Sequence, residues 1–282
     1  MFRRPSLLPA LALLLWISEV LSEDAPIQDP ITNVGNHQFL VTIDIISETT
    51  LKPVTSTQTG AIISKDYVLG TSPTVNISNL RFIVRVGSNL FDKDGEEYEA
   101  ELVILNTSTP EEPLNRGEEL NQLKLVLYKV KKPIQFGEKA NPVGLFDAND
   151  ETIMNHEVIL IGWGFNNNDT SSSILKRRIL DFEVNLLKND ECNTLKRKDM
   201  SETGVENIPQ IEKYLLPKSY SCASESDNNK NLSVIQPVDG AMLVSDEKLV
   251  GLFTGYMKAD KIYYVYADVA HYSQSIRSVT GL

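Results

Sequence analysis

Imidazole and thiol side chains, which carry much of the acid–base, nucleophilic and metal chemistry of proteins, are scarce in this sequence. Three histidines, His37, His156 and His271, and two cysteines, Cys192 and Cys222, are spread over 282 residues. No cluster of histidine, cysteine and acidic residues has the spacing of metal ligands, and no glycine-rich loop has the phosphate-binding pattern. The sequence therefore predicts no metal site and no cofactor.

The start of the chain predicts the compartment in which the protein works. Residues 1–22 combine two early arginines, a short apolar run and a small closing residue, Ser22, which is the pattern of a secretory signal peptide. The run is too short to span a bilayer, and no later segment is apolar for long enough to do so. Because secreted proteins usually pair their cysteines, we expect a disulfide between Cys192 and Cys222.

Sequons and charge agree with an extracellular location. Four acceptor sequons, at Asn76, Asn106, Asn168 and Asn231, predict N-glycosylation. The formal net charge of −11 argues against nucleic acid or an anionic membrane as the main partner. We therefore expect a secreted glycoprotein whose partners are other extracellular proteins.

The elements that would position functional residues are short strands in two groups. Apolar and polar residues alternate with the period of two typical of strands, and turn residues separate the segments. The first group comprises Phe39–Ile45, Ala61–Ile63, Tyr67–Leu69, Phe82–Val86, Leu102–Leu105 and Leu123–Val130. The second group comprises Val158–Ile161, Phe182–Leu187, Ala241–Val244, Leu249–Phe253 and Tyr263–Tyr266. This arrangement predicts an all-β fold of paired barrels.

The remaining segments define the predicted domain organisation. We expect a lead-in over 23–36, a first barrel over about 37–147 and a second barrel over about 148–267. A short amphipathic helix is predicted over Asp268–Val279, near the C-terminus. Two polar stretches, Asp199–Gln210 and Ser224–Leu232, are predicted to be surface loops.

Six segments, in order, resemble the trypsin-like serine protease family over residues 37–282. Gly60–Ser64 with Tyr67–Leu69 is similar to the family's GGSIIS…WVLTAAHC, and Ile161–Gly164 to its SGWG. The others are Leu125–Phe136 (DIALLKLSEPLTF), Asn189–Cys192 (NEEC), Gly240–Gly251 (GDSGGPLV…KLVGI) and Tyr264–Val269 (GVYTRV). The resemblance implies two antiparallel six-stranded barrels with an active cleft between them.

The residues at the family's catalytic positions cannot perform its chemistry. That chemistry needs a serine nucleophile, an imidazole base and a carboxylate that orients the imidazole. On the matched segments, Pro73 stands at the histidine position, Lys124 at the aspartate position and Asp239 at the serine position. Proline offers no base, a lysine cation would repel an imidazolium, and Asp239 would repel a forming oxyanion.

Other functional positions of the family also carry residues that cannot serve the family's chemistry or activation. Pro237 lacks the N–H that the family's oxyanion hole uses at that position. Val238 replaces the aspartate that pairs with the new amino terminus of activated members. Gln58 and Thr74 replace two cysteines that are bridged in the family, whereas the bridge that matches Cys192–Cys222 is retained. The resemblance therefore implies a catalytically inactive homologue.

Other candidate sites are weaker. On the alignment, the three histidines lie at a strand start, at the start of the second barrel and on the terminal helix, so we do not expect a rearranged triad. The basic run Lys176–Arg178 is interpreted as a solvated face, with a docking patch or a processing site as alternatives. Trp163 is expected in the core.

Two hypotheses on function follow. In the first, the chain is a secreted, non-catalytic homologue that binds extracellular proteins, such as proteases or other secreted homologues, as a cofactor, decoy or carrier. Its contacts are expected at the rim of the old cleft, on Tyr256 and the Ser224–Leu232 loop, while a Lys124–Asp239 pair could fill the place of the histidine. In the second, it is an enzyme with altered chemistry on the same fold.

The fluid in which the protein works is a further expectation. Related inactive homologues occur in haemolymph, saliva, venom and male reproductive secretions. The lead-in carries no cysteine-rich clip segment of the kind found in haemolymph homologues. This favours a glandular secretion such as seminal fluid.

Overall fold

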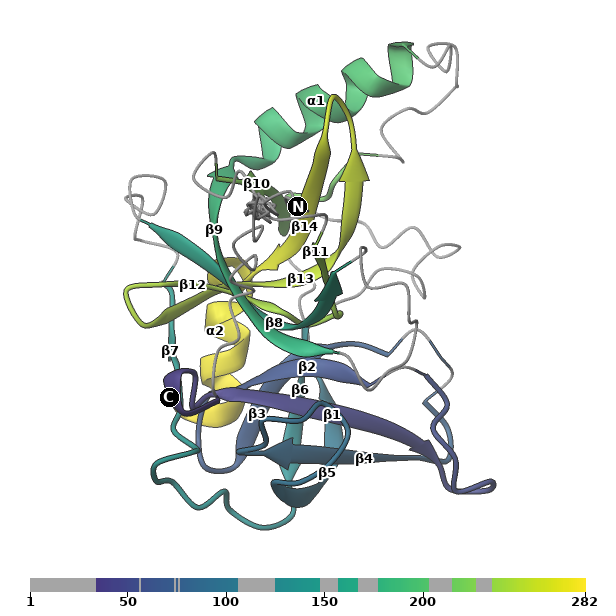
Figure 1. Ribbon diagram of the computed structural model, residues 1–282, viewed down its shortest axis with the longest axis vertical. Helices are drawn as coiled ribbons and strands as arrows, with labels where there is room; N and C mark the ends of the chain where they lie inside the picture. Colours follow the sequence, from purple (N-terminus) through teal and green to yellow (C-terminus); the bar gives the residue numbers. More distant parts are fainter. Residues whose placement is uncertain are drawn as a thin grey trace, which may run out of the picture.

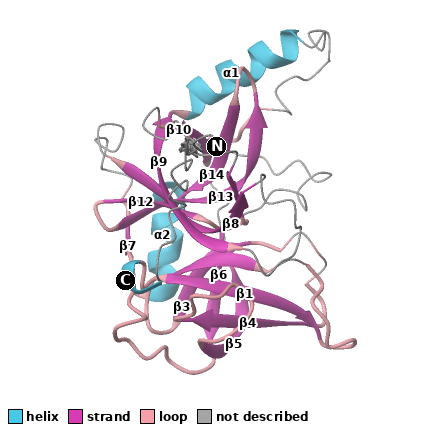
Figure 2. Cartoon of the chain, in the orientation of Figure 1, coloured by secondary structure: helices cyan, strands magenta, loops and turns pink. Residues whose placement is uncertain are grey.

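The fold is built almost entirely from strands, as predicted (Figure 2). The computed structural model describes residues 34–55, 57–73, 75, 77–105, 125–147, 157–166, 177–202, 215–226 and 235–282. Figure 1 shows a first barrel below and a second barrel above it, formed by the two halves of the chain in order. The predicted pair of closed, six-stranded antiparallel barrels is confirmed.

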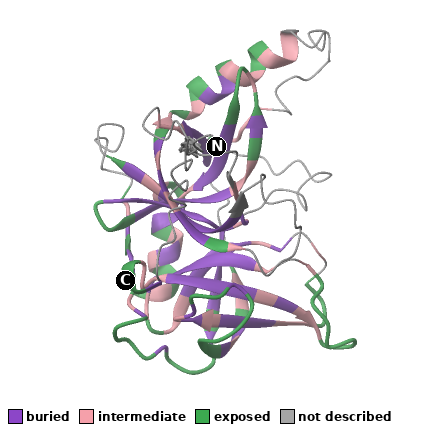
Figure 3. Ribbon diagram, viewed as in Figure 1, coloured by how far each residue is buried: buried purple, intermediate pink, exposed green. Residues whose placement is uncertain are grey.

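The first barrel closes in the strand order β1–β2–β3–β6–β5–β4. Its strands are β1 (Leu40–Ser47), β2 (Gln58–Ile62), β3 (Tyr67–Thr71), β4 (Leu80–Val86), β5 (Glu96–Ile104) and β6 (Leu125–Val130). The alternating apolar residues point into one core, in which Ile43, Val84 and Tyr128 are fully buried. Figure 3 shows this buried interior along the strands.

The second barrel closes in the order β8–β12–β13–β14–β10–β9, with β9 pairing back to β8. Its strands are β8 (Val158–Asn166), β9 (Arg178–Leu187), β10 (Tyr220–Glu225), β12 (Met242–Ser245), β13 (Lys248–Lys258) and β14 (Ile262–Asp268). Two short strands add to it: β11 (Ile235–Pro237) pairs with β8, and β7 (Gly144–Leu145) runs parallel to β13. The strand β10 was not predicted, and it completes the barrel.

A shared apolar core joins the barrels and the C-terminal helix α2 (Val269–Thr280). The helix matches the prediction over Asp268–Val279. The side chain of Asp268 accepts a hydrogen bond from the Ala270 N–H, which caps the first turn. The apolar face, on Val269, Tyr272 and Ile276, is buried in the core.

A second helix, α1 (Asn189–Glu202), corrects the predicted loop Asp199–Gln210. Residues 199–202 form the last turn of α1, and 203–210 lie outside the described residues. The helix is anchored at its start, where the Asn189 side chain donates to three backbone carbonyl oxygens of residues 216, 217 and 220. Polar composition hid this helix, because Cys192 and Leu195 are its described side chains in or against the apolar core and they form no long apolar stripe.

The predicted disulfide links α1 to β10. Cys192 and Cys222 are bonded, with their Cα atoms 5.9 Å apart, and both are fully buried. The predicted loop Ser224–Leu232 also needs correction, because Ser224 and Glu225 belong to β10. Residues 227–232 of that loop lie outside the described residues.

The N-terminal segment is described only from residue 34 onward. The last three residues of the predicted lead-in form a 3-10 turn, η1 (Val34–Asn36), with Val34 buried. Neither helix among the described residues combines the length and apolar character needed to cross a membrane.

Candidate functional site at the junction of the barrels

The turn between β11 and β12 carries Asp239, the residue predicted at the position of the family nucleophile. The backbone carbonyl of Asp239 accepts a 2.8 Å hydrogen bond from the N–H of Thr59 on β2. The N–H of Val238 donates to the Trp163 carbonyl of β8 over 2.7 Å. The turn is therefore tied to the first barrel on one side and to the second barrel on the other.

Gly240 allows this close approach of the two barrels. Its φ of +84° lies in the left-handed region that favours glycine. Any Cβ at this position would overlap the carbonyl oxygen of Thr59. Its N–H donates to the Phe253 carbonyl on β13 over 2.8 Å. Glycine at this position thus fixes the place of Asp239.

The Asp239 carboxylate is partly buried and has no hydrogen-bond or ion-pair partner among the described residues. Burial raises its pKa, and the positive charge of Arg177 partly opposes that rise. The predicted Lys124–Asp239 pair is not testable, because Lys124 lies outside the described residues. The described cation that acts on Asp239 is instead Arg177.

Arg177 precedes β9 and rests on an aromatic stack. Its guanidinium carbon lies 4.5 Å from the ring centroid of Phe91, within the range of a cation–π contact. Phe91 in turn meets Trp163 edge-on, with ring centroids 5.6 Å apart. Burial lowers the pKa of Arg177, and the negative charge of Asp239 opposes the change. Within the run Lys176–Arg178, interpreted from the sequence as a solvated face, Arg177 is of intermediate exposure and Arg178 is exposed, and Lys176 lies outside the described residues.

Tyr256, predicted as a binding residue, lies on β13. Its side chain is 46% exposed, and its ring packs against Phe253 and Tyr264 with centroids 4.9 and 5.9 Å away. Burial raises the pKa of Tyr256, and the charge of Asp239 raises it further. Tyr264 is anchored by a 2.7 Å hydrogen bond from its hydroxyl to Glu225. Tyr256 is therefore a partly exposed ring that packs against two other aromatic rings, one of which is held by a hydrogen bond.

Pro73 and Gln58, which the sequence comparison predicts at the positions of a family histidine and cysteine, are both buried. The Tyr128 hydroxyl donates to the carbonyl oxygen of Thr71 over 3.1 Å, and Gln58 Oε1 lies 3.4 Å from the same hydroxyl. Burial raises the pKa of Tyr128, so the hydroxyl stays protonated as a donor. Gln58 therefore lies beside a buried hydrogen-bonded hydroxyl, and Thr74, the other predicted cysteine replacement, lies outside the described residues.

Pro237 is buried in β11, where it pairs with Gly164 of β8. Proline has no N–H to direct at a ligand. Val238, the next residue, is 8% exposed and belongs to the shared core. Trp163 is 1% exposed, as predicted, and its Nε1–H has no acceptor among the described residues.

The two described histidines are engaged elsewhere. Nε2 of His37 lies 3.0 Å from Oδ2 of Asp181, which connects the start of the first barrel to β9. His271 lies on α2, where its ring contacts Tyr272. His156 lies outside the described residues, as do the sequon asparagines Asn76, Asn106, Asn168 and Asn231. Within the described ranges, no group of three or more metal-ligating side chains lies together.

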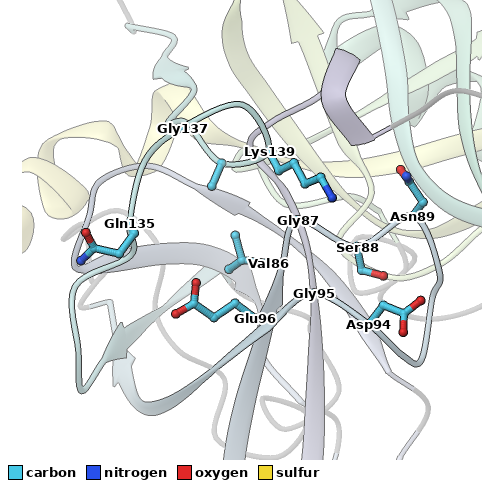
Figure 4. A pocket seen from close by; sticks show the side chains of 11 residues that line it. Val86, Gly87, Ser88, Asn89, Asp94, Gly95, Glu96, Gln135, Gly137 and Lys139 are labelled. Carbon is cyan, nitrogen blue, oxygen red and sulfur yellow. The ribbon is translucent and has the colours of Figure 1, made fainter.

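A hollow of about 320 Å³ lies on the first barrel and was not predicted from the sequence. Figure 4 shows charged and amide side chains around it, among them Asp94, Glu96, Gln135 and Lys139. None of the residues that line it belongs to the group around Asp239. We therefore take the junction of the barrels, and not this hollow, as the candidate site.

The two-barrel fold and a match to a family profile define the class of protein. The sequence profile of the trypsin family matches residues 32–276, which is most of the chain. The chain therefore belongs to the trypsin family.

Particular relatives extend this finding. The beta subunit of clotting factor G from Tachypleus tridentatus is 26% identical over 142 residues. That match covers 48% of this chain and 42% of the relative, so it spans less than half of the relative's length.

Solved structures resemble the chain in fold. The scabies mite inactivated protease paralogues S-D1 and S-I1 give TM-scores of 0.61 and 0.62 at 15% and 17% identity. The matches cover 89% and 90% of this chain and 95% and 98% of theirs. Neuropsin, a serine protease of mouse brain, gives 0.60 at 16% identity, over 88% of this chain and 97% of its own. At these identities the similarity establishes the fold alone.

Proposed function

We propose that this chain is a secreted, non-catalytic member of the trypsin family that binds another extracellular protein through the region around Asp239. The environment of Asp239 is the main observation that supports this proposal. A partly buried carboxylate stands at the position that the sequence comparison predicts for the nucleophile, and the described charged group that acts on it is the guanidinium of Arg177. A serine protease instead needs an imidazole base beside a hydroxyl.

The neighbouring residues support the same conclusion. The carboxylate of Asp239 would repel the oxyanion that forms during acyl transfer. Pro237 provides no N–H for such an oxyanion, and Pro73 provides no base. The described histidine His37 is engaged with Asp181. Each of these features opposes hydrolysis by the family's mechanism.

Several observations support an extracellular setting. The chain has a buried disulfide, a sequence typical of a signal peptide over 1–22, and four sequons. Its relative from Tachypleus tridentatus is named as a clotting factor subunit. We therefore propose partners within an extracellular network of proteases, as a cofactor, decoy or carrier, and a glandular fluid such as seminal fluid as the setting.

The proposed mode of action is testable with two exposed aromatic residues. Tyr256, whose pKa responds to the charge of Asp239, is 46% exposed, and Phe136 is 45% exposed in the loop after β6 on the first barrel. The wild type, Tyr256→Ala and Phe136→Ala proteins would be immobilised and used to capture partners from the native fluid. We expect Tyr256→Ala to retain about tenfold less partner than the wild type, because exposed aromatic side chains contribute much of the binding energy at such interfaces.

Phe136→Ala is the matched control and should retain the partner fully, with both variants checked for folding by circular dichroism. Retention by Tyr256→Ala together with loss in Phe136→Ala would contradict the proposed surface.

A further inference from the structure

The hollow on the first barrel is a second place where polar side chains converge (Figure 4). Its volume of about 320 Å³ is at the lower end of the range for small-molecule sites. One wall comes from residues 86–96, which join β4 to β5, and the other from residues 135–140, which follow β6. None of the lining residues belongs to the group around Asp239, so this inference does not depend on the proposed function.

Hydrogen bonds within the first wall hold its shape. The buried Ser88 hydroxyl accepts from the N–H of Leu90 over 2.9 Å and donates to the carbonyl oxygen of Lys93 over 2.5 Å. The side-chain carbonyl of Asn89 accepts from the N–H of Val34 over 2.8 Å. The loop therefore keeps its shape through its own contacts and through a bond to the segment that precedes β1.

The second wall is held in the same way. The N–H of Gly137 donates to the Ala140 carbonyl over 2.9 Å, and the Asn141 amide donates to the Gly137 carbonyl over 2.9 Å. The two walls also meet, because a Cβ on Gly87 would lie 3.1 Å from the Cβ of Lys139. A hollow that is formed in advance binds a ligand with little loss of loop and side-chain freedom.

The side chains around the hollow offer both donors and acceptors of hydrogen bonds. Asp94 and Glu96 contribute carboxylates from one wall, and Lys139 contributes an ammonium group from the other (Figure 4). Asn89 and Gln135 add amide groups, each with donor and acceptor atoms. Over the part of the chain that the structure describes, no three metal-ligating side chains gather here or elsewhere.

This composition disfavours several classes of ligand. An apolar ligand would remove the charged and amide groups from water without replacing their hydrogen bonds. A small anion is repelled by Asp94 and Glu96, and a small cation is repelled by Lys139. A ring with several hydroxyl groups meets neither obstacle, because each hydroxyl donates to a carboxylate or amide oxygen and accepts from an ammonium or amide N–H.

We propose that the hollow binds one uncharged sugar ring, either the terminal residue of a glycan on another extracellular protein or a free saccharide. The carboxylates of Asp94 and Glu96 accept hydrogen bonds from ring hydroxyls, and the ammonium group of Lys139 donates to another hydroxyl. The backbone of Asp94 is held in place by Arg85, which donates to its carbonyl oxygen over 3.2 Å.

The test uses the secreted, full-length protein and small probes. Methyl glycosides of mannose, galactose and N-acetylglucosamine present three sugar rings, and sorbitol presents similar hydroxyl groups on an open chain. Calcium chloride is titrated alone, because carboxylates are also ligands for calcium. Isothermal titration calorimetry and saturation-transfer NMR measure binding.

We expect saturable binding of at least one glycoside and at least about tenfold weaker binding of sorbitol, because an open chain loses more conformational freedom than a ring. Asp94→Asn and Lys139→Met should each weaken binding of the glycoside about tenfold, because a charge-assisted hydrogen bond is lost. Asparagine suits position 94, where φ of +59° lies in the left-handed region.

Asp92→Asn and Lys132→Met are the matched controls. Both residues are exposed and lie in the same two connecting segments, but neither lines the hollow. Both variants should bind the glycoside as the wild type does.

Absence of saturable binding of all three glycosides would overturn the proposal, and so would unchanged binding by both Asp94→Asn and Lys139→Met. Binding of sorbitol as tight as that of the glycosides would contradict a site shaped for a ring. Saturable binding of calcium without binding of any glycoside would assign the hollow to a cation instead.

A glycoprotein that ends in the bound sugar distinguishes the two sources. Loss of its binding after enzymatic removal of that sugar assigns the hollow to glycan ends, whereas binding of the free glycoside alone assigns it to a soluble saccharide. Tyr256→Ala separates this inference from the proposed function, because it should bind the glycoside as the wild type does. Failure of sugar binding contradicts only the hollow, and failure of Tyr256→Ala to lose the captured partner contradicts only the proposed surface.

Discussion

Replacing Gly240 with alanine tests whether the turn that carries Asp239 is held rigidly between the barrels. The added Cβ would overlap the Thr59 carbonyl oxygen, and φ of +84° is unfavourable for alanine. The left-handed conformation costs about 1–2 kcal/mol. Relief of the overlap costs about 1–3 kcal/mol. Loss of the hydrogen bond from Thr59 to Asp239 costs about 0.5–1.5 kcal/mol.

The expected loss for Gly240→Ala is therefore about 3–6 kcal/mol, a large part of a typical unfolding free energy of about 5–15 kcal/mol. Urea denaturation, followed by circular dichroism, measures it directly. Gly137→Ala is the control, because nothing lies within 4 Å of an added Cβ there. It should change stability by less than about 0.5 kcal/mol. A loss below about 1 kcal/mol for Gly240→Ala would refute the close contact of the barrels at this turn.

Three further predictions concern stability. Replacing Cys192 and Cys222, which are 30 residues apart, with alanine should lower the unfolding free energy by about 3–4 kcal/mol in urea titrations; a loss below about 1 kcal/mol would argue against a stabilising cross-link. Tyr128→Phe should cost about 1–3 kcal/mol in the same assay, because a buried hydroxyl donor is lost, and no change would contradict its role. Asp239→Asn should raise the Tm at pH 7 and leave it unchanged near pH 3. Burial raises the pKa of Asp239 in the folded state, so ionising this carboxyl destabilises the fold. The destabilisation is absent below the unfolded pKa of about 3.9, and it grows as pH rises toward the folded pKa. A larger gain in Tm at acid pH than at pH 7 would contradict the expected direction of the pKa shift.

Most of the fold could be predicted because its strands have a clear apolar alternation. The helix α2 was also predictable, since Asp268 provides a cap and Val269 and Ile276 provide an apolar face. The strand β10 was missed because its sequence is rich in serine. Ser221 and Ser224 are 8% and 5% exposed, so this strand is buried by its place in the barrel and not by apolar composition.

The candidate site was predictable only in part. The alignment located Asp239 and Tyr256, because flanking glycines and strands give strong local patterns. It did not single out Arg177, which stands in a run of three basic residues with no distinguishing pattern. Its contact with Phe91, 86 positions earlier in the chain, depends on how the two barrels pack. Such long-range contacts leave no mark on local periodicity.

The most direct test of the central claim is active-site labelling and hydrolysis by the purified, secreted protein. Wild type, Asp239→Ala and Asp239→Ser would be incubated with a fluorophosphonate probe and a panel of peptide substrates, beside an active trypsin as a positive control. We expect no labelling and no turnover for any of the three, because Pro73 and Pro237 leave the protein without the base and without an oxyanion donor. Turnover by the wild type that disappears in Asp239→Ala would contradict it.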